Sequence, residues 1–136
     1  MRWICAGLLF LFLATGCKKT VDKAAENALM EIITNGQWKV TSFTKGSNNI
    51  TPDFSVYLFQ FKRDGTVDAI KAGTVEKTGT WEGNAVNKSI VSSFSNATEP
   101  LILLNGTWSI TKTSLTFVES NQTVSGEERF LRLDKQ

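Results

Sequence analysis

The sequence predicts an all-β protein: a small up-and-down antiparallel β-barrel of about eight strands, preceded by one short N-terminal helix. Beyond Gly36, short segments rich in Thr, Val, Phe, Ile and Trp alternate with turns rich in Gly, Asn, Asp and Ser. A helical period of apolar residues is convincing only before that point. Consecutive antiparallel strands lose their exposed edges by closing into a barrel. Eight strands enclose room for side chains or one small ligand.

Residues 1–16 are typical of an export signal. Arg2 supplies a positive charge, a nearly unbroken apolar run extends from Trp3 to Ala14, and the small residues Thr15 and Gly16 follow. As a helix this run covers roughly 20 Å, whereas a bilayer core is roughly 30 Å thick. We therefore expect a cleaved leader rather than a membrane span.

The residues 13–17, Leu-Ala-Thr-Gly-Cys, resemble a bacterial lipobox. One difference is that Ala14 occupies the position, three before the cysteine, where that pattern usually has Leu. The resemblance implies that Cys17 becomes the lipidated first residue and anchors the protein in a membrane. The alternatives are an ordinary secretory signal that leaves Cys17 as a free thiol, or a hydrophobic N-terminal helix. An Asp after the cysteine would resemble the inner-membrane retention signal of enteric bacteria, so Lys18 favours the outer membrane. Residues 18–21 contain no carboxylate and so do not resemble the surface-display signal of the Bacteroidota, which favours the periplasmic face.

Composition limits the rest of the chain to one weakly charged domain. The chain has 136 residues, of which 120 follow Gly16, enough for one packed core and too few for two. Arg2 is the one charged residue in the leader, so its removal lowers the net charge from +2 to +1. This balance predicts neither nucleic-acid binding nor a polybasic membrane patch.

The segment 17–35 is expected to hold the lipidated cysteine, a short linker and an amphipathic helix over 20–34. Val21, Ala25, Ile32 and Ile33 recur at helical spacing. Thr20 can cap the start of the helix, and the Asn-Gly pair at 35–36 can end it. We expect this helix to flank or plug the domain formed by 36–136.

The strands are predicted from short β-rich segments bounded by turns. In the segment 54–62, Tyr57, Phe59 and Phe61 fall on one face, and the turn at 63–65 leads into the next strand. The segment 101–104 either runs into the strand at 107–111 or turns before it. We expect loops at 96–100 and 121–126. The remaining strands are expected at 38–44, 66–72, 78–82, 88–94, 114–119 and 127–133.

Three Gly-x-Trp motifs lie at predicted strand starts. The indole two residues after the glycine returns to the same face of the strand, where it can bury a large apolar area. Core packing explains this pattern better than a shared ligand-binding role. The motifs pair Gly36 with Trp38, Gly79 with Trp81, and Gly106 with Trp108.

Together these segments resemble the small lipocalin-like lipoproteins of the Bacteroidota. The matching motifs are at 36–40, 59–67, 79–81, 108–110, 115–117 and 130–133. The resemblance implies structural roles for Gly36, for Trp38 at the closed barrel end, and for a basic side chain stacked across that indole. Either Arg132 or Arg129 could supply the cation. Alternation places Arg129 on the face of Leu131 and Leu133.

We do not expect an enzyme. The chain has no histidine, and lipidation would leave no free cysteine, so no catalytic residue, metal site or cofactor is predicted. One hypothesis, slightly favoured, is a barrel that binds a small apolar or amphipathic ligand, with Arg129 as a carboxylate partner. The other is a filled barrel that interacts with, or inhibits, another envelope protein. The expected lining residues under the first hypothesis are Tyr57, Phe59, Phe61, Trp81 and Trp108.

Overall fold

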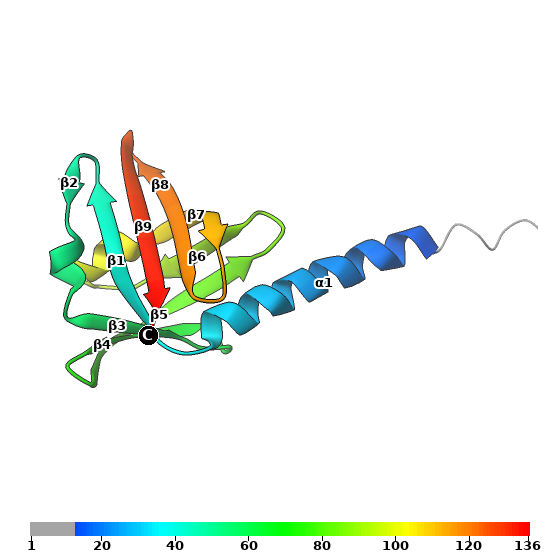
Figure 1. Cartoon of the computed structure of the whole chain (residues 1–136), viewed down its shortest axis with the longest axis horizontal. Helices are drawn as coiled ribbons and strands as arrows, with labels where there is room; N and C mark the ends of the chain where they lie inside the picture. The colour runs from blue at the N-terminus through cyan, green and yellow to red at the C-terminus, as the bar shows by residue number, and fades with distance from the viewer. Residues whose placement is uncertain (1–12) are drawn as a thin grey trace, which may run out of the picture.

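The computed structural model describes residues 13–136, with side chains from Lys23 onward. Residues 1–12 of the predicted leader and the side chain of Cys17 lie outside this description. One helix, α1 (Leu13–Thr34), precedes a strand-rich domain with two short 3₁₀ helices, η1 (Thr51–Phe54) and η2 (Leu101–Leu104) (Figure 1). The strands are β1 (Trp38–Lys45), β2 (Asn48–Asn49), β3 (Tyr57–Phe61), β4 (Thr66–Lys71), β5 (Thr74–Asn84), β6 (Ser89–Ser93), β7 (Gly106–Thr113), β8 (Phe117–Val124) and β9 (Glu127–Lys135).

The strands form a closed antiparallel barrel, as the sequence predicts. Each strand from β3 to β8 pairs with the next along the chain, and β1 pairs with both β3 and β9. The β1–β9 seam is long, running from Trp38 opposite Lys135 to Lys45 opposite Arg129. The two-residue β2 only extends β1, so the barrel itself has eight strands.

Helix α1 ends where predicted but begins earlier. Gly36 has φ +84°, a conformation that glycine adopts without strain, and the chain turns there from the helix into β1. The helix begins at Leu13 and runs through Thr20, which is therefore not its cap. Residues 23–28 are exposed, while Ile33 is buried against the barrel, so most of the helix projects from the domain (Figure 1). Within residues 13–136, no helix is both long and apolar enough to cross a membrane.

Two predicted elements differ in the structure. The segment Leu101–Leu104 forms the 3₁₀ helix η2 rather than a strand, because four adjacent aliphatic residues cannot all face one side of a strand. In η2, three of the four leucine and isoleucine side chains are buried and Ile102 is exposed. The predicted loop 121–126 is instead the end of β8, and only Ser125 and Gly126 form a turn into β9.

Aromatic side chains pack against one another toward both ends of the barrel. At the end near α1, the Phe61 and Trp81 rings meet edge to face with centroids 5.4 Å apart. At the far end, Phe43 stacks on Phe54 of η1 at 5.1 Å and meets Trp108 at 5.7 Å. The buried leucines of η2 belong to the same core.

Candidate functional site

The interior of the barrel holds a small apolar cavity of about 50 Å³. Ser92 and Ser120 supply its polar atoms. A water molecule needs about 10–15 Å³, and an engineered cavity that binds benzene measures about 150 Å³. The cavity therefore has room for a few water molecules and not for an acyl chain. Its wall consists of Phe59, Phe61, Val67, Ile90, Ser92, Phe94, Leu104, Trp108, Val118, Ser120, Leu131 and Leu133.

The side chains predicted to line a ligand site do not form one surface. Phe59, Phe61 and Trp108 line the cavity, whereas Tyr57 and Trp81 do not. Tyr57 is buried beside Phe59, and its hydroxyl hydrogen-bonds to Glu76. This hydrogen bond, together with burial, raises the pKa of Tyr57 to about 12.

Arg129 lies on the inner face of β9, as alternation predicts, but it is already paired. Its side chain is 14% exposed, and Nε donates to Glu127 Oε1 at 3.1 Å. Nη1 donates to Gln122 Oε1 at 3.4 Å. The Gln122 amide in turn donates to backbone carbonyls at the start of β7. Arg129 thus ties the far end of the barrel together and has a carboxylate partner from its own chain.

The three indoles of the Gly-x-Trp motifs are structural. Each is buried, and each N–H donates to a backbone carbonyl, which satisfies the polar atom inside the core. The acceptors are Ile33 O for Trp38 at 2.9 Å, Lys62 O for Trp81 at 2.8 Å, and Leu104 O for Trp108 at 2.9 Å.

The cation stacked across Trp38 is Lys135, so the expectation of Arg129 or Arg132 is wrong. Lys135 Nζ lies 5.1 Å from the centroid of the indole, because Lys135 pairs with Trp38 in the β1–β9 register. Arg132 points to the outer face, where its guanidinium lies 4.3 Å over the Phe117 ring. The alternation that places Arg129, Leu131 and Leu133 on one face also places Lys135 there, so the sequence pattern could have identified this residue.

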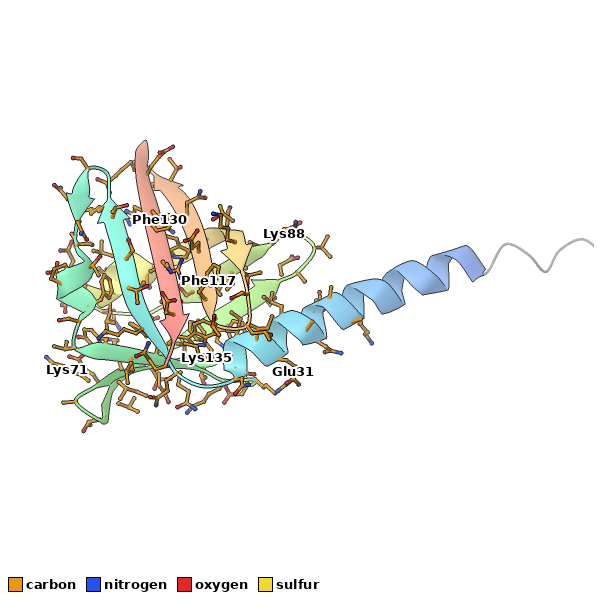
Figure 2. All side chains as sticks on the ribbon, in the orientation of Figure 1. Glu31, Lys71, Lys88, Phe117, Phe130 and Lys135 are labelled. Atoms are coloured by element: carbon orange, nitrogen blue, oxygen red, sulfur yellow. The ribbon has the colours of Figure 1, made fainter. Side chains whose placement is uncertain are left out.

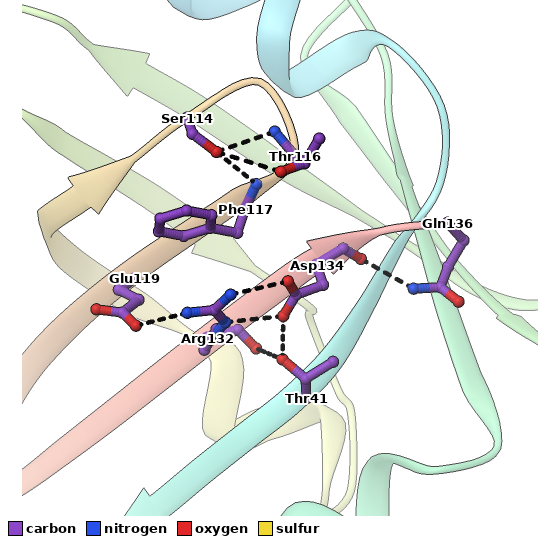
Figure 3. A network of polar contacts seen from close by, with 8 residues as sticks. All are labelled: Thr41, Ser114, Thr116, Phe117, Glu119, Arg132, Asp134 and Gln136. Carbon is purple, nitrogen blue, oxygen red and sulfur yellow. Dashed lines mark hydrogen bonds and ion pairs between the residues drawn. The ribbon is translucent and has the colours of Figure 1, made fainter.

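On the outer face of β1, β8 and β9, Arg132 is the centre of a polar network (Figure 3). It donates to Glu119 at 2.9 Å and to both carboxylate oxygens of Asp134 at 2.9 and 3.1 Å. The Thr41 hydroxyl also bonds to Asp134. These bonds lower the pKa of Asp134, chiefly through Arg132, and raise the pKa of Arg132, chiefly through Asp134. These bonds link β1, β8 and β9 and hold the three strands in register.

Farther along the same face, Phe130 lies toward the end away from α1 (Figure 2). The surface beside it is hollowed. Thr44 and Asn121 flank Phe130 in one row across the three strands, and Thr123 faces Glu128 in the next. We call this depression the Phe130 hollow; its volume is about 330 Å³. It is lined by Thr44, Gly46, Asn121, Gln122, Thr123, Glu128, Arg129 and Phe130.

Asp68 is a buried carboxylate for which the sequence pattern predicts no role. It lies on β4, is 6% exposed, and bonds to Lys62 Nζ and to the Thr78 hydroxyl, each at 2.7 Å. The hydrogen bond from Lys62, followed by that from Thr78, lowers the pKa of Asp68. Its role is to join β4 to β5 and to the turn after β3.

Lowering the pH should therefore destabilise the protein in part through Asp68. A carboxyl whose folded pKa is depressed stabilises the fold above its unfolded pKa of about 3.9, and this contribution is lost as pH falls through the folded value. We expect the free energy of unfolding, measured with urea, to fall between about pH 5 and about pH 3, because this window brackets the unfolded pKa. Asp68→Asn should reduce this fall, whereas Glu99→Gln, at an exposed loop position, should not. An unchanged pH dependence in Asp68→Asn would contradict the assignment.

No metal-binding group stands out among the described side chains, since no three Cys, Asp or Glu residues are placed to share an ion.

A scan against protein-family models and a search of curated proteins find no match. Among solved structures, the protein is similar to a DUF4847 family protein from Bacteroides vulgatus ATCC 8482. The likeness has a TM-score of 0.57 and 17% sequence identity, and it covers 79% of this chain and 99% of that one. At this identity the likeness shows a related barrel fold and nothing further. A lipocalin-like barrel is consistent with that fold.

Proposed function

We propose that this protein is a lipid-anchored module of the cell envelope that binds its partner on the outside of a filled barrel. The observation that carries the proposal is the small volume of the interior cavity, about 50 Å³, among buried aromatic and aliphatic side chains. Of the two functions considered from the sequence, this volume favours the interaction module. A site for a small ligand usually measures about 300–1,000 Å³.

Opening the interior to an acyl chain would disrupt the core. Phe59 and Phe94 on the cavity wall are at most 2% exposed, and their rings contact each other with centroids 6.4 Å apart. Moving such rings apart would remove close-packed contacts, each weak but large in sum. Glu127 already occupies Arg129, the predicted partner for a ligand carboxylate. Under this proposal the protein is a binding scaffold without enzymatic activity, and it holds no ligand inside the barrel.

The anchor is the second part of the proposal. Under it, residues 1–16 are removed, Cys17 is lipidated, and the protein is held at the outer membrane on its periplasmic side. The exposed part of α1 would then act as a spacer, since the twelve residues from Cys17 to Ala28 span about 18 Å as a helix. Among the described side chains of α1, from Lys23 onward, the first that pack on the barrel are those of Leu29 and Met30.

The interior is tested by titrating the protein with fatty acids of increasing length and with hydrophobic dyes. Because Trp108 lines the cavity, any entering ligand should change tryptophan fluorescence. We expect no saturable response. Leu131→Ala, which enlarges the cavity, is the positive control and should take up benzene-sized molecules. Saturable binding of a fatty acid by the unmodified protein would overturn the proposal.

The anchor is tested in the native cell by metabolic labelling with a fatty acid and by fractionation. Cys17→Ser should abolish the label and release the protein from the membrane fraction. Cys5→Ser changes the other cysteine of the chain, within the predicted leader, and should leave the labelling intact. Equal labelling of the Cys17→Ser variant would contradict lipidation at this residue.

A further inference from the structure

The outer face of β1, β8 and β9 has two contrasting halves. Near α1, Arg132, Glu119, Asp134 and Thr41 bond to one another in one network (Figure 3). In the Phe130 hollow, at the far end, the arrangement is the opposite. Within residues 23–136, four side chains around the Phe130 ring make no hydrogen bond or ion pair to another group of the protein. They are Thr44, Asn121, Thr123 and Glu128.

The hollow exists because the residues around the aromatic ring are short. Phe130 points outward between the inward-facing Arg129 and Leu131, and it is half-buried. Thr44 flanks the ring on one side, and Gly46 leaves the turn after β1 without a side chain. The depression of about 330 Å³ lies at the lower end of the range for small-molecule sites, about 300–1,000 Å³.

We propose that the Phe130 hollow is a binding site for a neutral saccharide. A sugar ring has one apolar face of C–H groups, which can pack on the Phe130 ring, and a rim of hydroxyls that both donate and accept hydrogen bonds. The hydroxyls of Thr44 and Thr123, the amide of Asn121 and the carboxylate of Glu128 supply matching partners on the sides of the hollow.

The groups of the hollow argue against anionic ligands and against purely apolar ones. An anionic ligand would meet the unpaired carboxylate of Glu128, and the nearby guanidinium of Arg129 is already neutralised by Glu127. A purely apolar ligand would bury the polar groups around the ring without satisfying them, which costs free energy. A polyhydroxylated neutral ligand avoids both penalties.

The site also lies at the end of the barrel away from the anchor. Along β9, Lys135 is at the end near α1 and Arg129 is at the other, about 20 Å away at the rise of a strand. A protein held at Cys17 would therefore present the hollow outward from the membrane. This inference rests on the proposed function, in which binding takes place outside the barrel, and it names the class of ligand.

The test is a titration of the full chain with neutral cello-, malto-, chito- and manno-oligosaccharides, followed by ¹H–¹⁵N NMR. Saturable shifts are expected at the amides of 44–46, 121–124 and 128–130. Phe130→Ala should weaken binding at least about tenfold, as loss of a central aromatic contact does. Asn121→Ala should also weaken it. Phe117→Ala, which removes the other half-buried aromatic on this face, is the matched control and should leave binding unchanged.

The outcomes separate the inference from the proposed function. Binding that is equally strong in folded Phe130→Ala and Asn121→Ala, shifts confined to other residues, or no shifts with any oligosaccharide would overturn the saccharide site. Preference for a proline-rich peptide over every sugar in the same hollow would also overturn it. In all these cases, a fatty-acid titration without a saturable response would still support the filled barrel. A saturable response to a fatty acid would contradict the filled barrel itself.

Discussion

Replacing Trp38 with alanine should lower the free energy of unfolding by about 3–5 kcal/mol, the usual cost of removing a buried aromatic side chain. The Trp38 side chain is 0% exposed and connects three elements. Its N–H bonds to Ile33 of α1, its backbone pairs with Phe59 of β3, and Lys135 of β9 lies across its ring. The substitution would leave a cavity at the barrel end that α1 covers.

Urea unfolding followed by circular dichroism measures this loss. Trp38→Phe should cost less, because it keeps an aromatic ring in the core. The remaining cost comes in part from the lost hydrogen bond to Ile33. Lys135→Met removes the stacked cation and should cost about 0.5–2 kcal/mol. A Trp38→Ala variant as stable as the parent would show that this indole does not hold the end of the barrel together.

Gly79→Ala should lower the free energy of unfolding by about 3 kcal/mol, the upper part of the range for overpacked cores. The reason is space rather than backbone conformation. A Cβ at this position would lie 2.5 Å from the carbonyl oxygen of Ser93 and 2.8 Å from Cδ1 of the fully buried Phe94. The backbone of β6 would have to move away from β5 to admit one methyl group.

Gly83→Ala, in the same strand, is the matched control. Its Cβ would meet Cδ2 of Leu29 at 3.2 Å and the edge of the Trp81 ring at 3.4 Å, and the leucine can shift. We expect a loss of about 1 kcal/mol or less, as for ordinary substitutions. The same unfolding measurement compares the two variants, and equal losses would argue against the close approach of β5 and β6 at Gly79.

The parts of the fold that the sequence predicted well are those with strong alternation. Tyr57, Phe59 and Phe61 face inward as expected, because each second residue of a strand returns to the same face. The four-residue aliphatic run of η2 carries no such alternation, and its tertiary packing turned it into a 3₁₀ helix. The polar composition of 121–126 concealed the end of β8, whose Gln122 points inward to Arg129.

The outer hollow could not have been predicted from the sequence. It depends on the register that sets Thr44 and Asn121 on either side of Phe130, and residues so far apart in the chain give no local signal. Asp68 was similarly hidden, because its burial depends on Lys62 and Thr78 from neighbouring elements. The Lys135 contact, by contrast, was accessible, since the alternation of β9 places it on the face of Leu133.

The most direct test of the filled barrel is a crystal structure of the protein grown with a long-chain fatty acid in excess. The account predicts that Phe59, Phe94 and Trp108 keep their positions around a cavity of about 50 Å³ that contains at most a few water molecules. Continuous acyl-chain density between Phe59 and Leu131, with the aromatic side chains displaced, would contradict it.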